Sequence, residues 1–293
     1  MRNAAQILVA CLAHACAAAS AAAPEMNPAA SLRAQYAVLA TQLAGNQFQR
    51  PMHLVSVQTP SRLEGDLYAL VDYPFATVSA ALRVPANWCD VMILHINTKY
   101  CRASTNPSGA VLAVRVGTKR DQALDSAYPL EFAYRVAAAA PDYFEVELTA
   151  KAGPLATSDY RIVLSAIAVE GGRAFVHLSY SYAYGVAGRL AMQAYLATGG
   201  RGKVGFTISG RRADGQPEYI GDVRGLVERN TMRYYLAIDA YLGALALPAA
   251  ARLEKRLHSW FASTERFARQ LHEADETDYL NMKRAEYLRQ QTN

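Results

Sequence analysis

The hydrophobic and polar positions at the start of the chain predict a mixture of helices and strands. Apolar residues recur at helical spacing within residues 32–43, which predicts an N-terminal helix. Strand-forming residues between turn signals predict strands at 53–58 and 63–71. Two short helices are predicted between residues 74 and 91, and they lead into a strand at 93–101.

The middle of the chain has the pattern of an antiparallel meander. Apolar and polar residues alternate there, as they do in strands with one buried and one wet face. Strands are predicted at residues 111–117, 130–137, 143–150, 160–169 and 174–184. The last two are joined by a Gly-Gly turn typical of a hairpin.

Helical spacing returns after Gly185 and predicts a helical C-terminal part. A helix at 186–198 is followed by a hairpin with its turn at Asp214-Gly215. Asn230 then resembles an N-cap that opens a further helix. Residues 249–273 predict a long amphipathic helix, and 279–290 a last, weaker one.

Composition places the chain among globular proteins, and its first residues indicate export. The chain has 293 residues, of which 52% are hydrophobic and 19% charged, enough to bury a large core. Residues 1–23 combine Arg2, an apolar stretch and an Ala-Ser-Ala cleavage site, the pattern of a signal peptide. Cys11 lies in a sequence of lipoprotein form, but only ten residues precede it, so we favour periplasmic export over a lipid anchor. No later stretch has the length of a transmembrane helix.

The net charge does not indicate a nucleic-acid-binding protein. The formal charge of +5 falls to +4 when Arg2 is removed with the signal. The remaining basic residues are interleaved with acidic ones, above all within 252–273. Such mixing is typical of a solvated helix face, and no nucleic-acid partner is predicted.

Cys89 and Cys101 are the cysteines that remain after the signal is removed. In an oxidising compartment two such thiols usually pair, and closing this short loop is worth roughly 3 kcal/mol. A reactive or metal-binding role is the alternative, but the sequence has no CxxC motif and no zinc spacing. We therefore predict a structural disulfide, no metal and no cofactor.

The element order resembles a known superfamily. Residues 67–88 contain YALVDYPFATVSAALRVPANW, similar to the entry of the START-like (SRPBCC) superfamily, where Pro-Phe opens one helix and Trp closes the next. The resemblance covers about residues 60–200. The segments 153–161, 203–207 and 228–235 are similar to parts of exported bacterial proteins of this kind.

The resemblance implies an α+β, helix-grip fold, in which a curved antiparallel sheet wraps a helix and holds an apolar or aromatic ligand. It assigns the gripping helix to 186–198. We divide the chain into the signal, an N-terminal helix and leading strand at 24–59, the START-like domain at 60–200, and an extension at 201–293. The additional C-terminal helices either cover the mouth of the cavity or plug it.

Alternating tyrosines are the first candidate for a ligand site. Tyr180, Tyr182 and Tyr184 share one face of a strand, and Tyr134 on a neighbouring strand joins that face. One interpretation is a cavity wall that stacks on an apolar ligand. The other is aromatic packing of the sheet against a helix.

Two further groups carry candidate chemistry. His95 shares a predicted strand face with Asn97 and Lys99, so it is a weak candidate for an acid or base, although hydrogen bonding at a wet face also explains it. Glu228, Arg229 and Arg233 predict a charged network, which either positions a ligand carboxylate or fastens the C-terminal helices.

Three functions are compatible with these patterns. The first is an exported protein, not an enzyme, that binds or carries a hydrophobic or lipid-like molecule. The second is a cyclase or hydrolase that uses the same cavity through His95 or Tyr182. The third is an envelope scaffold whose long helix at 249–273 docks a protein partner.

Overall fold

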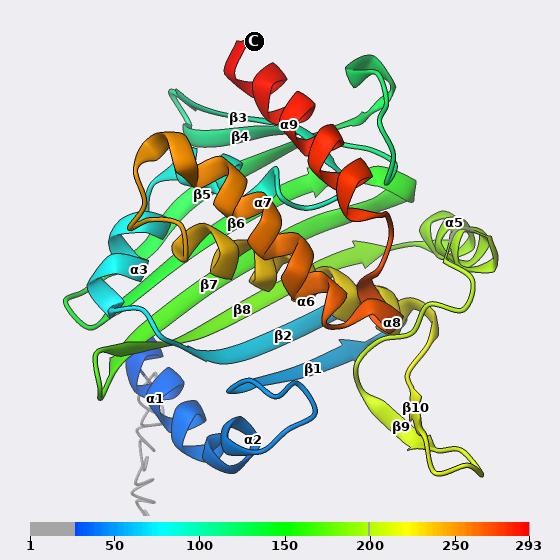
Figure 1. Ribbon diagram of the computed structural model, residues 1–293, viewed down its shortest axis with the longest axis horizontal. Helices are drawn as coiled ribbons and strands as arrows, with labels where there is room; N and C mark the ends of the chain where they lie inside the picture. Colours follow the sequence, from blue (N-terminus) through cyan, green and yellow to red (C-terminus); the bar gives the residue numbers. More distant parts are fainter. Residues whose placement is uncertain (1–26, 199, 293) are drawn as a thin grey trace, which may run out of the picture.

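The computed structural model describes residues 27–198 and 200–292. The predicted signal peptide, its cleavage site and Cys11 therefore lie outside the described residues. The helices and strands of these residues form one layered structure, in which helices lie on both faces of a large sheet (Figure 1).

The large sheet has eight antiparallel strands in the order β1-β2-β8-β7-β6-β5-β4-β3. The strands are β1 (Met52–Gln58), β2 (Arg62–Val71), β3 (Thr98–Asn106), β4 (Gly109–Val116), β5 (Tyr128–Ala139), β6 (Tyr143–Ala152), β7 (Thr157–Val169) and β8 (Arg173–Tyr184). A separate small hairpin consists of β9 (Ile208–Arg211) and β10 (Pro217–Tyr219). The meander from β3 to β8 confirms the predicted run of antiparallel strands.

Along the chain, helices precede β1, separate β2 from β3, and follow β8. They are α1 (Pro28–Val38), α2 (Ala40–Ala44), α3 (Phe75–Leu82), α4 (Pro85–Met92), α5 (Val186–Ala197), α6 (Asp222–Leu242), α7 (Ala249–Glu265), α8 (Ala268–Leu271) and α9 (Glu276–Thr292). The α+β class and the sheet wrapped on a helix are as predicted. The predicted helix at 249–273 is interrupted, because Phe267 leaves the helical conformation between α7 and α8.

The helix held by the sheet is α6, which corrects the assignment of this role to 186–198. α6 crosses β2, β1 and β8, and α7 lies over its outer side (Figure 1). Most of its residues are buried, so it lacks the polar face that marks a surface helix. It begins at Asp222, and Asn230, predicted as an N-cap, lies within it. Residues 201–293 thus contain part of the central core.

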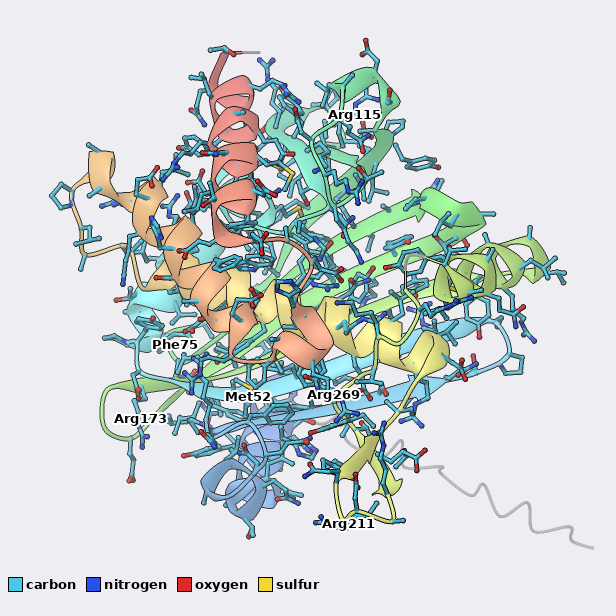
Figure 2. The ribbon with its side chains drawn as sticks, turned by 45° about the vertical axis from the view of Figure 1, so that its right-hand side comes forward. Met52, Phe75, Arg115, Arg173, Arg211 and Arg269 are labelled. Atoms are coloured by element: carbon cyan, nitrogen blue, oxygen red, sulfur yellow. A yellow bond between two sulfur atoms is a disulfide. The ribbon has the colours of Figure 1, made fainter. Side chains whose placement is uncertain are left out.

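Glycine at position 65 permits the close approach of α6 to the sheet. A Cβ atom at Gly65 of β2 would lie 2.4 Å from Oγ1 of Thr231 on α6. Apolar residues at alternate positions of β2, among them Leu63 and Leu67, then pack on the helix. Met52 of β1 and Phe75 of α3 are also buried in this core (Figure 2).

The opposite face of the sheet carries a smaller apolar cluster. Leu32 and Tyr36 of α1 pack there with Phe175 of β8. His177 points to this side, stacked on Tyr68 at 4.3 Å between ring centroids. α1 therefore covers part of the outer face of the sheet, at β7 and β8, and α6 packs on the inner face.

The entry into the first meander strand differs from the prediction. Residues 93–97 form turns after α4, and β3 begins only at Thr98. The backbone N–H of His95 donates to the Met92 carbonyl at 3.0 Å, which continues the helical turn. The apolar residues Ile93, Leu94 and Ile96 are buried by this turn and do not form a strand.

The disulfide between Cys89 and Cys101 is confirmed. It joins α4 to β3 across a sequence separation of 12, with the Cα atoms 5.1 Å apart, and both residues are buried. Its place between helix and sheet assigns it a structural role.

We expect Cys89→Ser to lower the free energy of unfolding by roughly 3 kcal/mol, because the unfolded chain regains the freedom of the closed loop. Denaturant unfolding of both proteins under oxidising conditions measures this. Cys101→Ser should give the same loss, and equal stability of parent and variant would contradict a structural role.

Candidate functional site

Tyrosines gather on the face of β8 that points to α6. Tyr180, Tyr182 and Tyr184 are all buried there. Tyr160 of β7 stacks on Tyr182, with the ring centroids 5.2 Å apart. The structure thus brings three predicted tyrosines together and adds Tyr160, which had been assigned only to a strand. We call these four residues the tyrosine face.

Tyr134 shares the same side of the sheet but lies apart from the tyrosine face. It is on β5, which is three strands from β8. Its hydroxyl donates to the Leu82 carbonyl at the end of α3, at 3.1 Å. The indole N–H of Trp88 donates to the same carbonyl at 2.8 Å. Tyr134 therefore fastens the entry helices to the sheet.

Side chains from α5 and α6 cover the tyrosine face. The ring of Tyr180 lies 5.3 Å from that of Tyr234 on α6. The hydroxyl of Tyr182 lies 3.7 Å from Sδ of Met192 on α5. Burial raises the pKa of Tyr180 and of Tyr182, so both phenols keep their protons at neutral pH.

α5 is held by few buried contacts. Only Gly188 and Met192 are buried among its residues. Val186 and Leu190 are exposed by 78% and 62%, although both are apolar. α5, one of the two helices that cover the tyrosine face, is therefore held by few buried side chains.

His95 is buried and neutral, which corrects its predicted place on a wet strand face. Its ring lies 5.0 Å from that of Tyr234. Nδ1 accepts a hydrogen bond from the Asn97 N–H, and Nε2 has no partner. Burial first, and then the charge of Arg233, hold the pKa of His95 well below its ordinary value. Within the described residues no carboxylate orients this ring as a catalytic base would require.

Glu228 is a buried anchor for the chain that precedes β9. Its carboxylate accepts hydrogen bonds from the N–H groups of Phe206 and Thr207, from the Thr207 hydroxyl, and from the hydroxyl of Ser56 on β1. These four bonds occupy both carboxylate oxygens. A Cβ atom at Gly205 would lie only 2.4 Å from Oε2, so glycine is required there.

Arg229 and Arg233 turn away from Glu228 toward other partners. Nη2 of Arg233 donates to Glu273 at 2.6 Å. Nη1 of Arg229 donates to the Val204 carbonyl at 3.2 Å. The predicted network of three residues is thus divided between two places, and Glu273, which pairs with Arg233, was not identified from the sequence.

A second buried charge cluster, also missed from the sequence, lies beneath α9. Glu286 accepts hydrogen bonds from Lys99 at 2.9 Å and from Lys283 at 2.7 Å, and all three side chains are fully buried. Lys283 also donates to the His95 and Thr98 carbonyls. This cluster, which we call the lysine clamp, ties α9 to β3.

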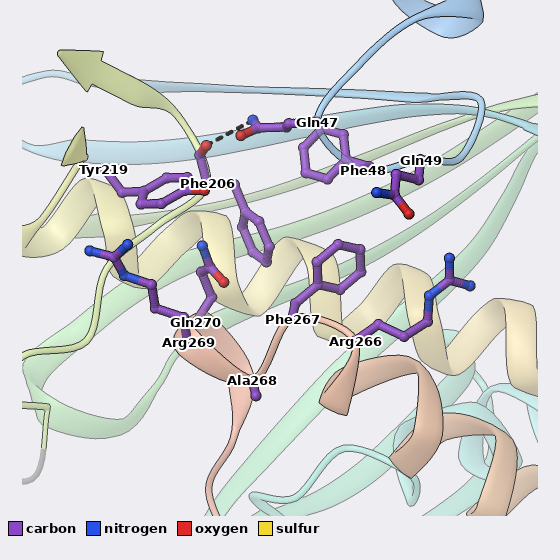
Figure 3. Close-up of a pocket in the computed structure, with 10 residues that line it drawn as sticks. All are labelled: Gln47, Phe48, Gln49, Phe206, Tyr219, Arg266, Phe267, Ala268, Arg269 and Gln270. Atoms are coloured by element: carbon purple, nitrogen blue, oxygen red, sulfur yellow. Dashed lines mark hydrogen bonds between the residues drawn. The ribbon is translucent and has the colours of Figure 1, made fainter. Parts of the chain in front are cut away.

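Two surface pockets lie near the β9 hairpin, beside the loop that follows α2. One, of about 250 Å³, is lined by Gln47, Phe48, Gln49, Phe206, Tyr219, Arg266, Phe267, Ala268, Arg269 and Gln270 (Figure 3). The other, of about 500 Å³, shares Gln47 and Phe48 with it and extends along β1. Neither is lined by a residue of the tyrosine face.

The described residues, 27–198 and 200–292, contain neither a metal site nor a membrane-spanning helix. No group of His, Cys, Asp and Glu side chains there is arranged to hold a metal ion. No helix of that part is long and apolar enough to cross a membrane.

Comparisons with known proteins bear on the fold. No family model and no curated protein sequence matches the chain. Among solved structures, a norcoclaurine synthase mutant from Thalictrum flavum is 10% identical, covering 49% of this chain and 89% of its own, with a TM-score of 0.34. Ara h 8.0201 is 11% identical over 65% and 97%, with a TM-score of 0.34. The human StarD13 lipid transfer and protein localization domain is 6% identical over 49% and 76%, at 0.31.

With TM-scores this low, these likenesses carry no argument about a ligand or a reaction. The fold follows from the topology itself: two helices after the second strand, an antiparallel meander, and a helix gripped by the sheet. The chain has a helix-grip fold. Its outer edge strand β1 and helices α7–α9 are additions around that core.

Proposed function

We propose that this protein is an exported, periplasmic binding protein that carries a hydrophobic, lipid-like molecule between the tyrosine face and α5. The observation that supports it most is a contrast in packing. The tyrosine face is buried, whereas α5, which covers it at Tyr182, buries only Gly188 and Met192. A ligand that displaces α5 outward gains four aromatic rings and loses few contacts.

The chemistry of this face suits an apolar ligand with a polar end. Rings of Tyr160 and Tyr182 offer stacking surfaces, and protonated hydroxyls offer hydrogen bonds that orient a head group. The disulfide between Cys89 and Cys101 agrees with an oxidising compartment. The predicted signal peptide is the further reason to propose export.

The third hypothesis, a docking helix, receives less support. Leu257 and Trp260, central to the apolar stripe of α7, are buried against the rest of the chain. Trp260 stacks on Tyr279 of α9 at 4.9 Å, so α9 covers part of that stripe. A partner would have to displace α9 to reach it.

Met192→Trp tests the proposed place of the ligand. We expect the larger side chain to fill the space under α5 and to lower the amount of bound molecule severalfold, by about 1 kcal/mol or more of binding energy. Native mass spectrometry of protein purified from an exporting host measures bound species, and extraction with organic solvent identifies them.

Leu190→Trp is the matched control, because Leu190 is exposed on the same helix. It should carry as much ligand as the parent. A parent protein that is folded, homogeneous and free of any bound small molecule, even after incubation with lipid extract, would overturn the proposed function.

A further inference from the structure

Basic side chains from distant parts of the chain converge next to the tyrosine face. Arg229 and Arg233 come from α6, Lys119 from the loop after β4, and Lys203 from the loop after α5. We call these four residues the cation cluster. Lys119, Lys203 and Arg233 pair with one carboxylate, that of Glu273 between α8 and α9. The same carboxylate also acts electrostatically on Arg229.

The contacts to Glu273 leave an excess of positive charge. Lys119 lies 2.6 Å and Lys203 3.8 Å from Oε2, and Arg233 lies 2.6 Å from Oε1. Four cations and one anion give a local charge of +3. Glu228 also attracts Arg229, and counting its charge reduces the local charge to +2. The oxygens of Glu228, however, already accept hydrogen bonds from four other donors.

One nitrogen atom of each arginine in this cluster is buried without a hydrogen-bond partner. Arg229 is 1% exposed and Arg233 2%, and neither Nη2 of Arg229 nor Nε of Arg233 has a hydrogen-bond acceptor. Burial, and then the charge of Arg233, lower the pKa of Arg229 to about 10. An unpaired guanidinium nitrogen inside a protein is costly, because it has lost water and gained nothing in exchange.

His95 adds a third donor of the same kind. Its Nδ1 accepts a hydrogen bond from the Asn97 N–H, which places the proton of the neutral ring on Nε2. That Nε2 is buried without a partner. The charges of Arg233 and Lys119 act on the ring, so it borders the cation cluster. All three unsatisfied atoms are donors, and an anion is the acceptor that forms the strongest hydrogen bonds with such donors.

The cation cluster is reachable from solvent and continuous with the tyrosine face. The side chains of Lys119 and Lys203 are exposed by 20% and 22%, whereas Arg233 behind them is at 3%. The charge of Arg229 acts on the Tyr182 hydroxyl. Tyr234 contacts both His95 and Tyr180, which joins the two regions.

We infer that the cation cluster binds the acidic group of the carried molecule, a carboxylate or a phosphate, so that the ligand class is an acidic amphiphile. This inference rests on the proposed function for the apolar body of the ligand. The anion would accept from Arg229, Arg233 and His95, while Lys119 and Lys203 close over it from solvent. Arginine forks fit carboxylate and phosphate oxygens equally well, so both anions share this site chemistry.

Paired probes test this inference on the full mature chain. Decanoate and 1-decanol differ in the acidic group, and isothermal titration should show decanoate binding about tenfold or more tightly. Inorganic phosphate, compared with chloride at equal ionic strength, should raise the melting temperature without any lipid tail.

Lys119→Gln with Lys203→Gln is the informative double variant, because both side chains are partly exposed and Arg233 still pairs with Glu273. It should lose most of the preference for decanoate and the phosphate effect. Lys151→Gln with Lys255→Gln removes the same charge from exposed positions and should retain both.

The outcomes separate the two proposals. Equal binding of decanoate and decanol, with no specific phosphate effect, overturns the anion site and leaves the proposed function standing. A phosphate effect that the double variant loses, without binding of either amphiphile, supports the anion site and overturns the carrier function. Identical behaviour of the double variant and its charge control overturns the assignment to the cation cluster.

Discussion

Replacing Glu286 by glutamine is expected to lower the free energy of unfolding by about 3–5 kcal/mol, because it leaves two buried lysines without their shared carboxylate. Lys99 and Lys283 are both fully buried and both bond to Glu286. Burial already lowers the pKa of Lys283 to about 8, against the attraction of Glu286. Without that attraction its pKa falls further, and the ammonium becomes harder to retain. Denaturant unfolding measures the loss.

Glu254→Gln is the matched control for this experiment. Glu254 of α7 pairs with Arg284 of α9, the helix that also carries Glu286. Both side chains of this pair are nearly half exposed. Exposed pairs contribute roughly 0–1 kcal/mol, so this variant should stay close to the parent. Equal and small losses for both variants would show that the lysine clamp does not hold α9.

Replacing Glu228 by alanine is expected to cost about 3–5 kcal/mol as well, because four donors lose their acceptor in a buried place. The N–H groups of Phe206 and Thr207 have no alternative partner once the carboxylate is gone. We therefore expect faster hydrogen exchange in residues 203–207, the segment that also carries Lys203. Unfolding and hydrogen-exchange measurements on the same sample check both effects.

Two variants with smaller expected losses of stability serve as comparisons for Glu228→Ala. Ser56→Ala removes one of the donors to Glu228 and should cost about 1 kcal/mol. Glu218→Ala changes an exposed carboxylate on β10 and should be nearly neutral. A loss for Glu228→Ala no larger than that for Ser56→Ala would contradict the anchoring role.

Local patterns were sufficient for much of the fold. The strands β4 to β6 were predictable because buried residues alternate with more exposed ones. β7 and β8 are buried on both faces over much of their length, and the turn at Gly171-Gly172 that separates them was their clearest signal. The disulfide followed from two cysteines and an export signal. Side chains alternate between the two faces of a strand, and this alone was enough to predict that Tyr180 and Tyr182 share one face of β8.

The gripped helix could not be identified by the same reasoning. α6 packs against the sheet on one side and α7 on the other, so apolar and polar residues are buried all around it. A helix without a polar face has no clear amphipathic period. α5, by contrast, carries a helical pattern of apolar residues, yet Val186 and Leu190 remain exposed.

The charge clusters depended on partners that lie far apart in the sequence. Lys99 and Glu286 are separated by 187 residues, and Lys119 and Glu273 by 154. A lysine in a strand and a glutamate in a C-terminal helix give no local signal of pairing. His95 was misplaced for a related reason: its apolar neighbours suggested a strand, but tertiary burial of a turn explains them equally well.

Hydrogen exchange read by mass spectrometry tests most directly whether a ligand binds between the tyrosine face and α5. With decanoate present, we predict altered exchange in peptides that cover α5 and β8, and an unchanged rate in the pocket lined by Phe48 and Phe267. Protection confined to that pocket, or the same exchange pattern with and without decanoate, would contradict a ligand site between the tyrosine face and α5.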